Sequence, residues 1–263
     1  MHIEQIWTDN PYRNFNYLIA CPRTGEALAV DPLEADLCMA RAREKGWTIT
    51  QVVNTHEHPD HIGGNPRIIE ATGARLLAHA GAGDRIPGMD VGLQAGDVIR
   101  IGQEVELRVL DTPGHTMSHV CLYADGEQPA LICGDTLFNA GAGNCHNGGH
   151  PEELYQTFAE QLAALPEATR VYPGHDYIGN NLAFTLDREP GNERARSLLA
   201  EVADQDPARA RVTHLGLEKE VNAFFRLRNP ELIERLRGDF ADLPAEPTPK
   251  QVFLKLRELR NSW

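Results

Sequence analysis

The chain has 263 residues, of which 38 are acidic and 25 basic, so its formal net charge is −13 at pH 7. A chain of this length can bury roughly 70–75% of its unfolded surface, whereas its negative charge repels nucleic-acid phosphates and anionic lipids. No segment approaches the ~18 consecutive apolar residues of a spanning helix, and the N-terminus resembles no secretory signal. We therefore expect a soluble, cytoplasmic protein with reduced cysteines and no nucleic-acid or membrane partner; no oligomeric state is predicted.

Short apolar segments bounded by turn residues predict strands over the first 175 residues. In chain order these segments are Asn16–Ala20, Glu26–Val30, Ile49–Asn54, Arg75–Ala78, Val98–Ile101, Glu104–Leu110, His119–Tyr123, Ala130–Cys133 and Arg170–Tyr172. Apolar residues at helical spacing predict helices over Glu34–Lys45 and Glu152–Leu165. The interleaving of strands and helices indicates an α/β fold with sheet layers flanked by helices.

The pattern changes near Gly174 to Asn181, after which helical periodicity dominates. Proline and glycine separate five predicted helices, Asn181–Leu186, Glu193–Asp204, Leu217–Leu227, Pro230–Arg237 and Pro249–Arg260. We therefore predict a catalytic domain over residues 1–175 and a helical domain over residues 176–263.

Four potential metal ligands, His56, His58, Asp60 and His61, lie within six residues directly after a predicted strand. In extended chain, residues two apart point the same way, so His56 and His58 can bind one ion. The turn at Pro59 presents Asp60 and His61 to a neighbouring position. This short segment could therefore serve two metals, and Pro59 excludes the helical His-Glu-x-x-His zinc motif.

Three further candidates, His115, Asp135 and His175, each follow a predicted strand and a glycine. A preceding glycine lets the backbone turn sharply and approach an ion without a Cβ clash. Ligands at strand ends can converge at one edge of a sheet, so these residues can join the first four.

The ordered pattern Thr55-His56-x-His58-x-Asp60-His61, Thr-Pro-Gly-His115, Gly-Asp135 and Gly-His175 resembles the metallo-β-lactamase superfamily. The neighbouring sequences Gly-Asp135-Thr-Leu-Phe and Tyr-Pro-Gly-His175-Asp-Tyr177 look like its glyoxalase II, or hydroxyacylglutathione hydrolase, branch. This resemblance implies a four-layer αβ/βα sandwich with a C-terminal helical substrate domain. It also implies hydrolysis of S-(2-hydroxyacyl)glutathione to glutathione and a 2-hydroxy acid.

By matching positions, the resemblance assigns His56, His58 and His115 to one metal and Asp60, His61 and His175 to the other. Asp135 would bridge the two, and Asp60 and Asp135 would also act in catalysis. Two divalent ions can activate water and polarise a carbonyl group, so no serine or cysteine nucleophile is needed. Mixed nitrogen and carboxylate ligands suit zinc, iron or manganese, of which zinc and iron are the leading expectations.

The residues expected to bind substrate are Asn144, His146, Tyr177, Arg257 and Arg260. Asn144 and His146 stand where the glyoxalase II branch has a basic residue and a tyrosine, so a thiol other than glutathione stays open. Arg257 and Arg260 match the branch's Arg-x-x-Lys pair on its C-terminal helix. Their guanidinium groups can bind carboxylates, although a solvated helix face is an equal interpretation.

The main rival is a glutathione persulfide dioxygenase with one iron at His56, His115 and Asp135. The long helical tail favours hydrolysis, as does the absence of arginine between Asp135 and Arg170. A hydrolase of another acyl thioester is a further alternative, and a β-lactamase, an RNA nuclease and a binding module are disfavoured. His119 is expected to support or pack near the ligands, and Asp31 to orient a ligand or cap a turn.

Overall fold

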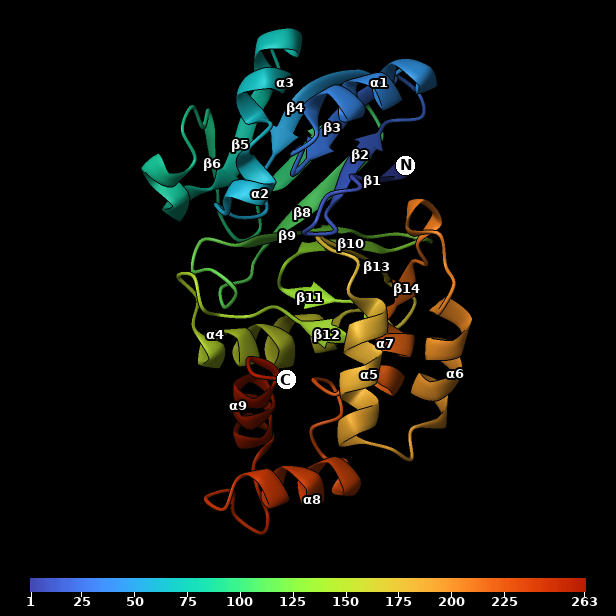
Figure 1. Ribbon diagram of the computed structural model, residues 1–263. Helices are drawn as coiled ribbons and strands as arrows, with labels where there is room; N and C mark the ends of the chain where they lie inside the picture. Colours follow the sequence, from blue (N-terminus) through green and yellow to red (C-terminus); the bar gives the residue numbers. More distant parts are fainter.

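The computed structural model describes residues 1–263 and contains two six-stranded sheets packed face to face (Figure 1). The first sheet has the strand order β1 (His2–Trp7), β2 (Phe15–Ala20), β3 (Glu26–Val30), β4 (Thr48–Val53), β5 (Arg75–His79) and β6 (Val91–Leu93). The second has the order β14 (Thr213–His214), β13 (Arg170–Pro173), β10 (Ala130–Gly134), β9 (Val120–Ala124), β8 (Val105–Asp111) and β7 (Val98–Ile101).

Helices cover the outer faces of both sheets, so the molecule has four layers (Figure 1). The α-helices are α1 (Ala35–Lys45), α2 (Pro59–Ile62), α3 (Asn65–Thr72), α4 (Pro151–Gln156), α5 (Ile178–Arg188), α6 (Glu193–Val202), α7 (Leu215–Val221), α8 (Pro230–Asp239) and α9 (Pro249–Arg260). Helices α1 and α3 pack on the first sheet, and α4 and α9 lie on the side of the second. The prediction of an α/β sandwich is confirmed. No helix has the length and apolar character needed to cross a bilayer.

The main core lies between the two sheets. Its members include Phe15 and Tyr17 from β2 and Leu107, Val109 and Leu122 from the second sheet, all almost fully buried. Because each buried Å² of apolar surface contributes about 25 cal/mol, this layer drives the pairing of the sheets. The pairing in turn brings loops from both sheets to one edge.

Several elements differ from the sequence predictions. The predicted helix Leu217–Leu227 ends at Val221, because Asn222 is extended and its buried amide donates to the Gly141 carbonyl (3.0 Å). The predicted helix Glu152–Leu165 changes after Gln156 into short π and 3₁₀ turns, η2 (Thr157–Gln161) and η3 (Leu162–Ala164). Two other 3₁₀ turns are η1 (Ala80–Arg85) and η4 (Pro207–Arg209). Sequence analysis missed strands β1, β6 and β14, the hairpin of β11 (Leu137–Phe138) and β12 (Gly141–Ala142), and helices α2 and α3.

Helix α9 is attached to the body of the protein through one apolar face. A capping box between Thr248 and Gln251 begins the helix, with Pro249 at its first position. Val252 and Phe253 are fully buried on this face, and the Phe253 ring meets aromatic rings of α4, η2 and the segment after α7. The helix therefore has a defined position against the second layer.

We expect Phe253→Ala to lower the free energy of unfolding by about 3–5 kcal/mol, because it leaves a cavity among aromatic rings. Urea denaturation followed by circular dichroism measures the change. Lys250→Ala is the matched control on the same helix, since its ion pair with Glu152 is exposed to solvent and contributes little to stability. A loss below 1 kcal/mol for Phe253→Ala would contradict the described packing.

Candidate metal centre

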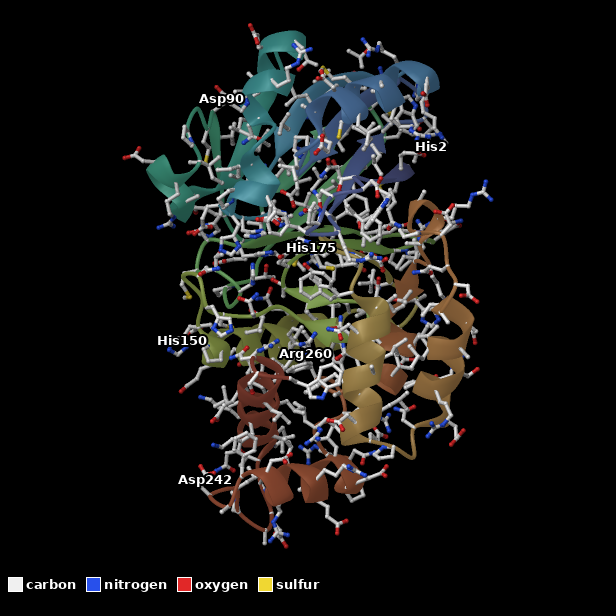
Figure 2. All side chains as sticks on the ribbon, viewed as in Figure 1. His2, Asp90, His150, His175, Asp242 and Arg260 are labelled. Carbon is white, nitrogen blue, oxygen red and sulfur yellow. The ribbon has the colours of Figure 1, made fainter.

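All the predicted ligands follow the carboxyl ends of strands. His56 to His61 follow β4 of the first sheet, and His115, Asp135 and His175 follow β8, β10 and β13 of the second. Strands β10 and β13 are parallel, and β9 is antiparallel to both β8 and β10, so β8, β10 and β13 run in one direction. Their ends therefore meet at the same edge, and Figure 2 shows His175 between the two sheets.

The first ligand group consists of His56, His58 and His115. His58 Nδ1 lies 3.0 Å from His56 Nε2 and 3.0 Å from His115 Nε2. Tetrahedral nitrogen ligands about 2.0–2.1 Å from a zinc ion lie about 3.3 Å apart, close to this spacing. The three imidazoles therefore match three corners of a metal site.

A second group, Asp60, His61 and His175, lies beside the first. The two Nε2 atoms of His61 and His175 are 3.3 Å apart, and Asp60 Oδ2 lies 3.6 and 3.5 Å from them. Helix α2 carries Asp60 and His61 on one turn directly after His58. The ring of His61 lies 4.1 Å from that of His56, and His56, His61 and Asp135 form a further possible ligand group, so the two groups adjoin.

Asp135 lies between the two groups. Its Oδ2 is 3.5 Å from His115 Nε2 and 3.1 Å from His175 Nε2, while its Oδ1 is 3.4 Å from His61 Nε2. Oδ1 is buried without any hydrogen-bond partner. A buried carboxylate oxygen without a donor is costly unless a cation is near, so this atom fits a metal ligand.

Each ligand histidine directs one ring nitrogen into the centre and places the other within hydrogen-bond distance of an acceptor oxygen. The pairs are His56 Nδ1 with Thr55 Oγ1 (3.0 Å), His58 Nε2 with Asn147 O (3.0 Å), His61 Nδ1 with Asp31 Oδ2 (2.9 Å), His115 Nδ1 with Asn144 O (2.7 Å) and His175 Nδ1 with Tyr12 O (2.7 Å). Such contacts set the tautomer and ring orientation of metal-binding histidines. Asp31 also accepts from Thr55 Oγ1 (2.7 Å), which favours its orienting role.

Burial and neighbouring charges shift the pKa of these groups in different directions. Burial alone would lower the pKa of His61, but Asp135 and Asp31 raise it well above its usual value. Burial dominates at two other histidines. It lowers the pKa of His56 well below its usual value and that of His115 to about 4, so both rings are neutral at pH 7. Burial alone would raise the pKa of Asp135, but His175 and His61 hold it well below its usual value. Neutral imidazoles and an ionised carboxylate are the forms that coordinate metals.

Comparison with known proteins identifies the family. Residues 17–175 match the metallo-beta-lactamase superfamily, and residues 176–263 match the hydroxyacylglutathione hydrolase C-terminus. The chain is 66% identical to a hydroxyacylglutathione hydrolase of Nitrosococcus oceani and 65% identical to one of Polaromonas sp., each over 100% of both chains. The chain belongs to the hydroxyacylglutathione hydrolase family. The predicted superfamily and branch are therefore confirmed.

Solved structures share the fold of this hydroxyacylglutathione hydrolase family member. ETHE1 from Myxococcus xanthus aligns with a TM-score of 0.68 and 26% identity over 99% of this chain and 98% of its own. TTHA1623, solved in a di-iron-bound form, has a TM-score of 0.59 and 24% identity over 84% of this chain and 98% of its own. The second likeness concerns the fold alone. Together with the His and Asp groups, family membership indicates that the chain binds divalent metal.

The predicted substrate residues of this family member lie in different environments. Tyr177 stacks on the ring of His175 with centroids 5.0 Å apart, and its hydroxyl donates to Tyr12 O (2.9 Å). Asn144 is half-buried and His146 exposed on the loop after β12. These three residues lie on segments that also carry or contact metal-ligand candidates.

The two arginines of α9 differ from each other. Arg260 is half-buried over Phe184 and Trp263 and makes no hydrogen bond or ion pair, so its guanidinium group is available to a ligand. Arg257 is only 4% exposed, and its Nη1 donates to Ala142 O (2.9 Å) and Gly143 O (3.0 Å). The free carboxylate-binding fork expected from the sequence is therefore not what the structure shows for Arg257.

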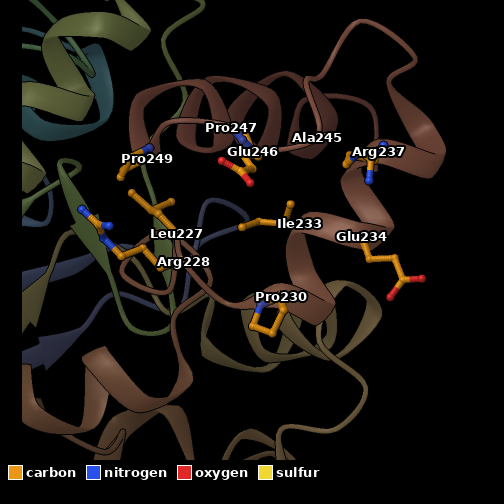
Figure 3. A pocket seen from close by; sticks show the side chains of 10 residues that line it. All are labelled: Leu227, Arg228, Pro230, Ile233, Glu234, Arg237, Ala245, Glu246, Pro247 and Pro249. Atoms are coloured by element: carbon orange, nitrogen blue, oxygen red, sulfur yellow. The ribbon is translucent and has the colours of Figure 1, made fainter.

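A surface pocket of about 520 Å³ lies apart from the metal centre, between α8 and the segment that leads into α9 (Figure 3). Arg228 and Glu246 are among its lining residues, and none of the predicted site residues lines it. The pocket therefore belongs to the surface of the helical region and not to the ligand cluster.

Sequence analysis missed part of the support of the centre. Asn14 Nδ2 donates to Asp60 Oδ2 (3.1 Å), although Asn14 lies outside every motif. The acceptors from Tyr12, Asn144 and Asn147 are backbone carbonyls, which no residue type signals. His119, expected as a supporting residue, accepts from the backbone N–H of Asp135 (3.2 Å) and so holds that ligand's main chain.

We expect Gly174→Ala to reduce bound metal at least 10-fold, because its Cβ would lie 2.2 Å from Asp135 Oδ1 and displace that carboxylate. Elemental analysis after dialysis against limiting zinc measures the effect. Gly179→Ala is the matched control, since a Cβ at that position meets nothing within 4 Å. Full metal content in Gly174→Ala would refute the position given to Asp135.

Proposed function

We propose that this protein hydrolyses S-(2-hydroxyacyl)glutathione to glutathione and a 2-hydroxy acid at a centre of two divalent ions. The observation that carries the proposal is the contact of Asp135 with both ligand groups, since its two oxygens face His61, His115 and His175. Membership of the hydroxyacylglutathione hydrolase family supports this thioester class.

The first ion would be held by His56, His58 and His115, the second by Asp60, His61 and His175, with Asp135 between them. Zinc and iron suit these donors best, and manganese is compatible. Bound ions would supply Lewis acidity that activates water and polarises the thioester carbonyl. Asn14 keeps Asp60 Oδ2 turned toward the centre, and Asp60, about a quarter exposed, can accept a hydrogen bond from that water.

The substrate's peptide portion would extend from the centre toward the helical region. Tyr177 lies against His175, the loop with Asn144 and His146 lies by His115, and Arg260 offers a free guanidinium group. The division into a catalytic domain (1–175) and a substrate domain (176–263) is part of this proposal. The five cysteines are all free, which together with the acidic charge supports a cytoplasmic location.

The expected outcome for Asp135→Ala is the loss of at least one metal equivalent and a fall in S-lactoylglutathione hydrolysis of more than 100-fold, because both ions lose a shared ligand. Metal analysis and an assay of thiol release measure the two effects. Asp84→Ala, which removes an exposed carboxylate without hydrogen bonds, should change neither.

The same preparations distinguish the rival reaction. The proposal fails if the protein holds one iron per chain and consumes oxygen with glutathione persulfide while S-lactoylglutathione is left intact. If thioesters of other thiols were hydrolysed in preference to the glutathione thioester, thioester hydrolysis would stand as the reaction, and glutathione would be rejected as the thiol of the substrate.

A separate prediction concerns Arg260. Arg260→Gln should raise KM for S-lactoylglutathione about 10-fold or more with little change in kcat, because a charge-assisted carboxylate contact is lost. The matched control is a lactoyl thioester of N-acetylcysteamine, which lacks the glutathione carboxylates and should show no change. An equal rise in KM for both substrates would show that Arg260 does not bind the glutathione carboxylates.

A further inference from the structure

The segment from Asn139 to Asn144 joins the metal centre to the helical region. It begins four residues after Asp135 and ends at Asn144, whose carbonyl accepts the Nδ1–H of His115 (2.7 Å). Its neighbour Gly143 packs against the main chain of Asp135 so closely that a Cβ would lie 1.9 Å from the Asp135 carbonyl oxygen. A displacement of this segment would therefore reach His115 directly.

Three helices of the C-terminal region hold the backbone of this segment. Asn181 of α5 donates to Asn139 O (3.0 Å), and Glu218 of α7 accepts from Ala140 N (2.8 Å). Arg257 of α9 holds the other end through its Nη1 contacts with the carbonyls of residues 142 and 143. Both ends of the segment are therefore fixed from outside the β-sandwich.

The Arg257 guanidinium group is itself fixed. Its Nε and Nη2 atoms donate to Asn261 Oδ1 (3.2 and 3.0 Å), and its Cζ lies 5.5 Å from the centre of the Phe224 ring. A guanidinium group has five N–H donors, and these contacts together with the two carbonyls engage four of them. Little donor capacity is left for a substrate carboxylate, in contrast to Arg260.

We infer that Arg257 is a positioning residue of the metal centre: it holds the carbonyls of Ala142 and Gly143 so that the next carbonyl, of Asn144, fixes the ring of His115. Removal of Arg257 frees the loop end of the segment, and His115 then loses a fixed acceptor for Nδ1–H. An outer contact of this kind typically changes metal affinity or activity about 10–100-fold. The inference rests on the proposed hydrolase activity for its kinetic readout, and its metal readout is independent of that activity.

The test compares Arg257→Gln with Arg260→Gln in the full-length protein. Zinc competition against a chromogenic chelator should show at least a 10-fold loss of affinity for one metal equivalent in Arg257→Gln and no loss in Arg260→Gln. The cobalt-substituted Arg257→Gln protein should show a changed d–d spectrum, since the orientation of one imidazole ligand changes. Its kcat for S-lactoylglutathione should fall about 10-fold or more, whereas Arg260→Gln should affect KM.

Arg257→Lys keeps a cation that can reach the two carbonyls, so it should recover part of the metal affinity. If circular dichroism shows that Arg257→Gln does not fold, Arg257→Lys replaces it in the zinc and cobalt measurements. Wild-type zinc affinity and cobalt spectrum in both Arg257 variants, with KM alone raised, would overturn the inference and restore direct carboxylate binding. If the wild-type protein fails to hydrolyse S-lactoylglutathione, the proposed function falls, and the zinc and cobalt measurements still decide the role of Arg257.

Discussion

The buried carboxylate of Asp135 needs cationic or hydrogen-bond-donating groups around it, and the fold has to bring them there. An ionised group with an unpartnered oxygen is several kcal/mol unfavourable in a protein interior unless cationic or donor groups surround it. Three histidines from three separate loops approach the two oxygens, and glycine at position 174 leaves them room. Only the packing of the two sheets at one edge brings these loops together, so the fold is inseparable from the site.

The predictable part of the fold was the part with a local cause. Strands β2, β3, β9 and β10 are buried on both faces, so their sequences are continuous apolar segments that stand out without tertiary information. The missed strands β1, β6 and β14 all lie at sheet edges. They exist because a neighbour supplies hydrogen-bond partners, and their own residues give only a weak pattern. The early end of α7 likewise comes from the distant contact of Asn222 with Gly141.

The ligand candidates could be predicted from the sequence because imidazole and carboxylate side chains are typical metal ligands and stand in an ordered pattern. The groups that orient these ligands were harder to predict. Asp31 and His119 are polar side chains near strand ends and could be proposed for this role. The acceptors for His58, His115 and His175 are backbone carbonyls, which any residue type can provide. The two arginines of α9 show the same limit. Spacing of three residues predicts a shared helix face, but it does not reveal that Arg257 meets a backbone turn while Arg260 remains free.

The helical region, proposed to form one wall of a substrate site, also contacts the backbone that supports the ligand cluster. A wall that only supplied side chains to the substrate could shift against the sheets by a fraction of an ångström with little effect on the ions. Here strand β14 joins the edge of the second sheet, and three helices hold the backbone between Asp135 and Asn144. Because Arg257 contacts Gly143 O and the next carbonyl, of Asn144, contacts His115, one series of contacts connects α9 with that ring. If substrate binds against α9 as proposed, its binding and the geometry at His115 would depend on the same contacts.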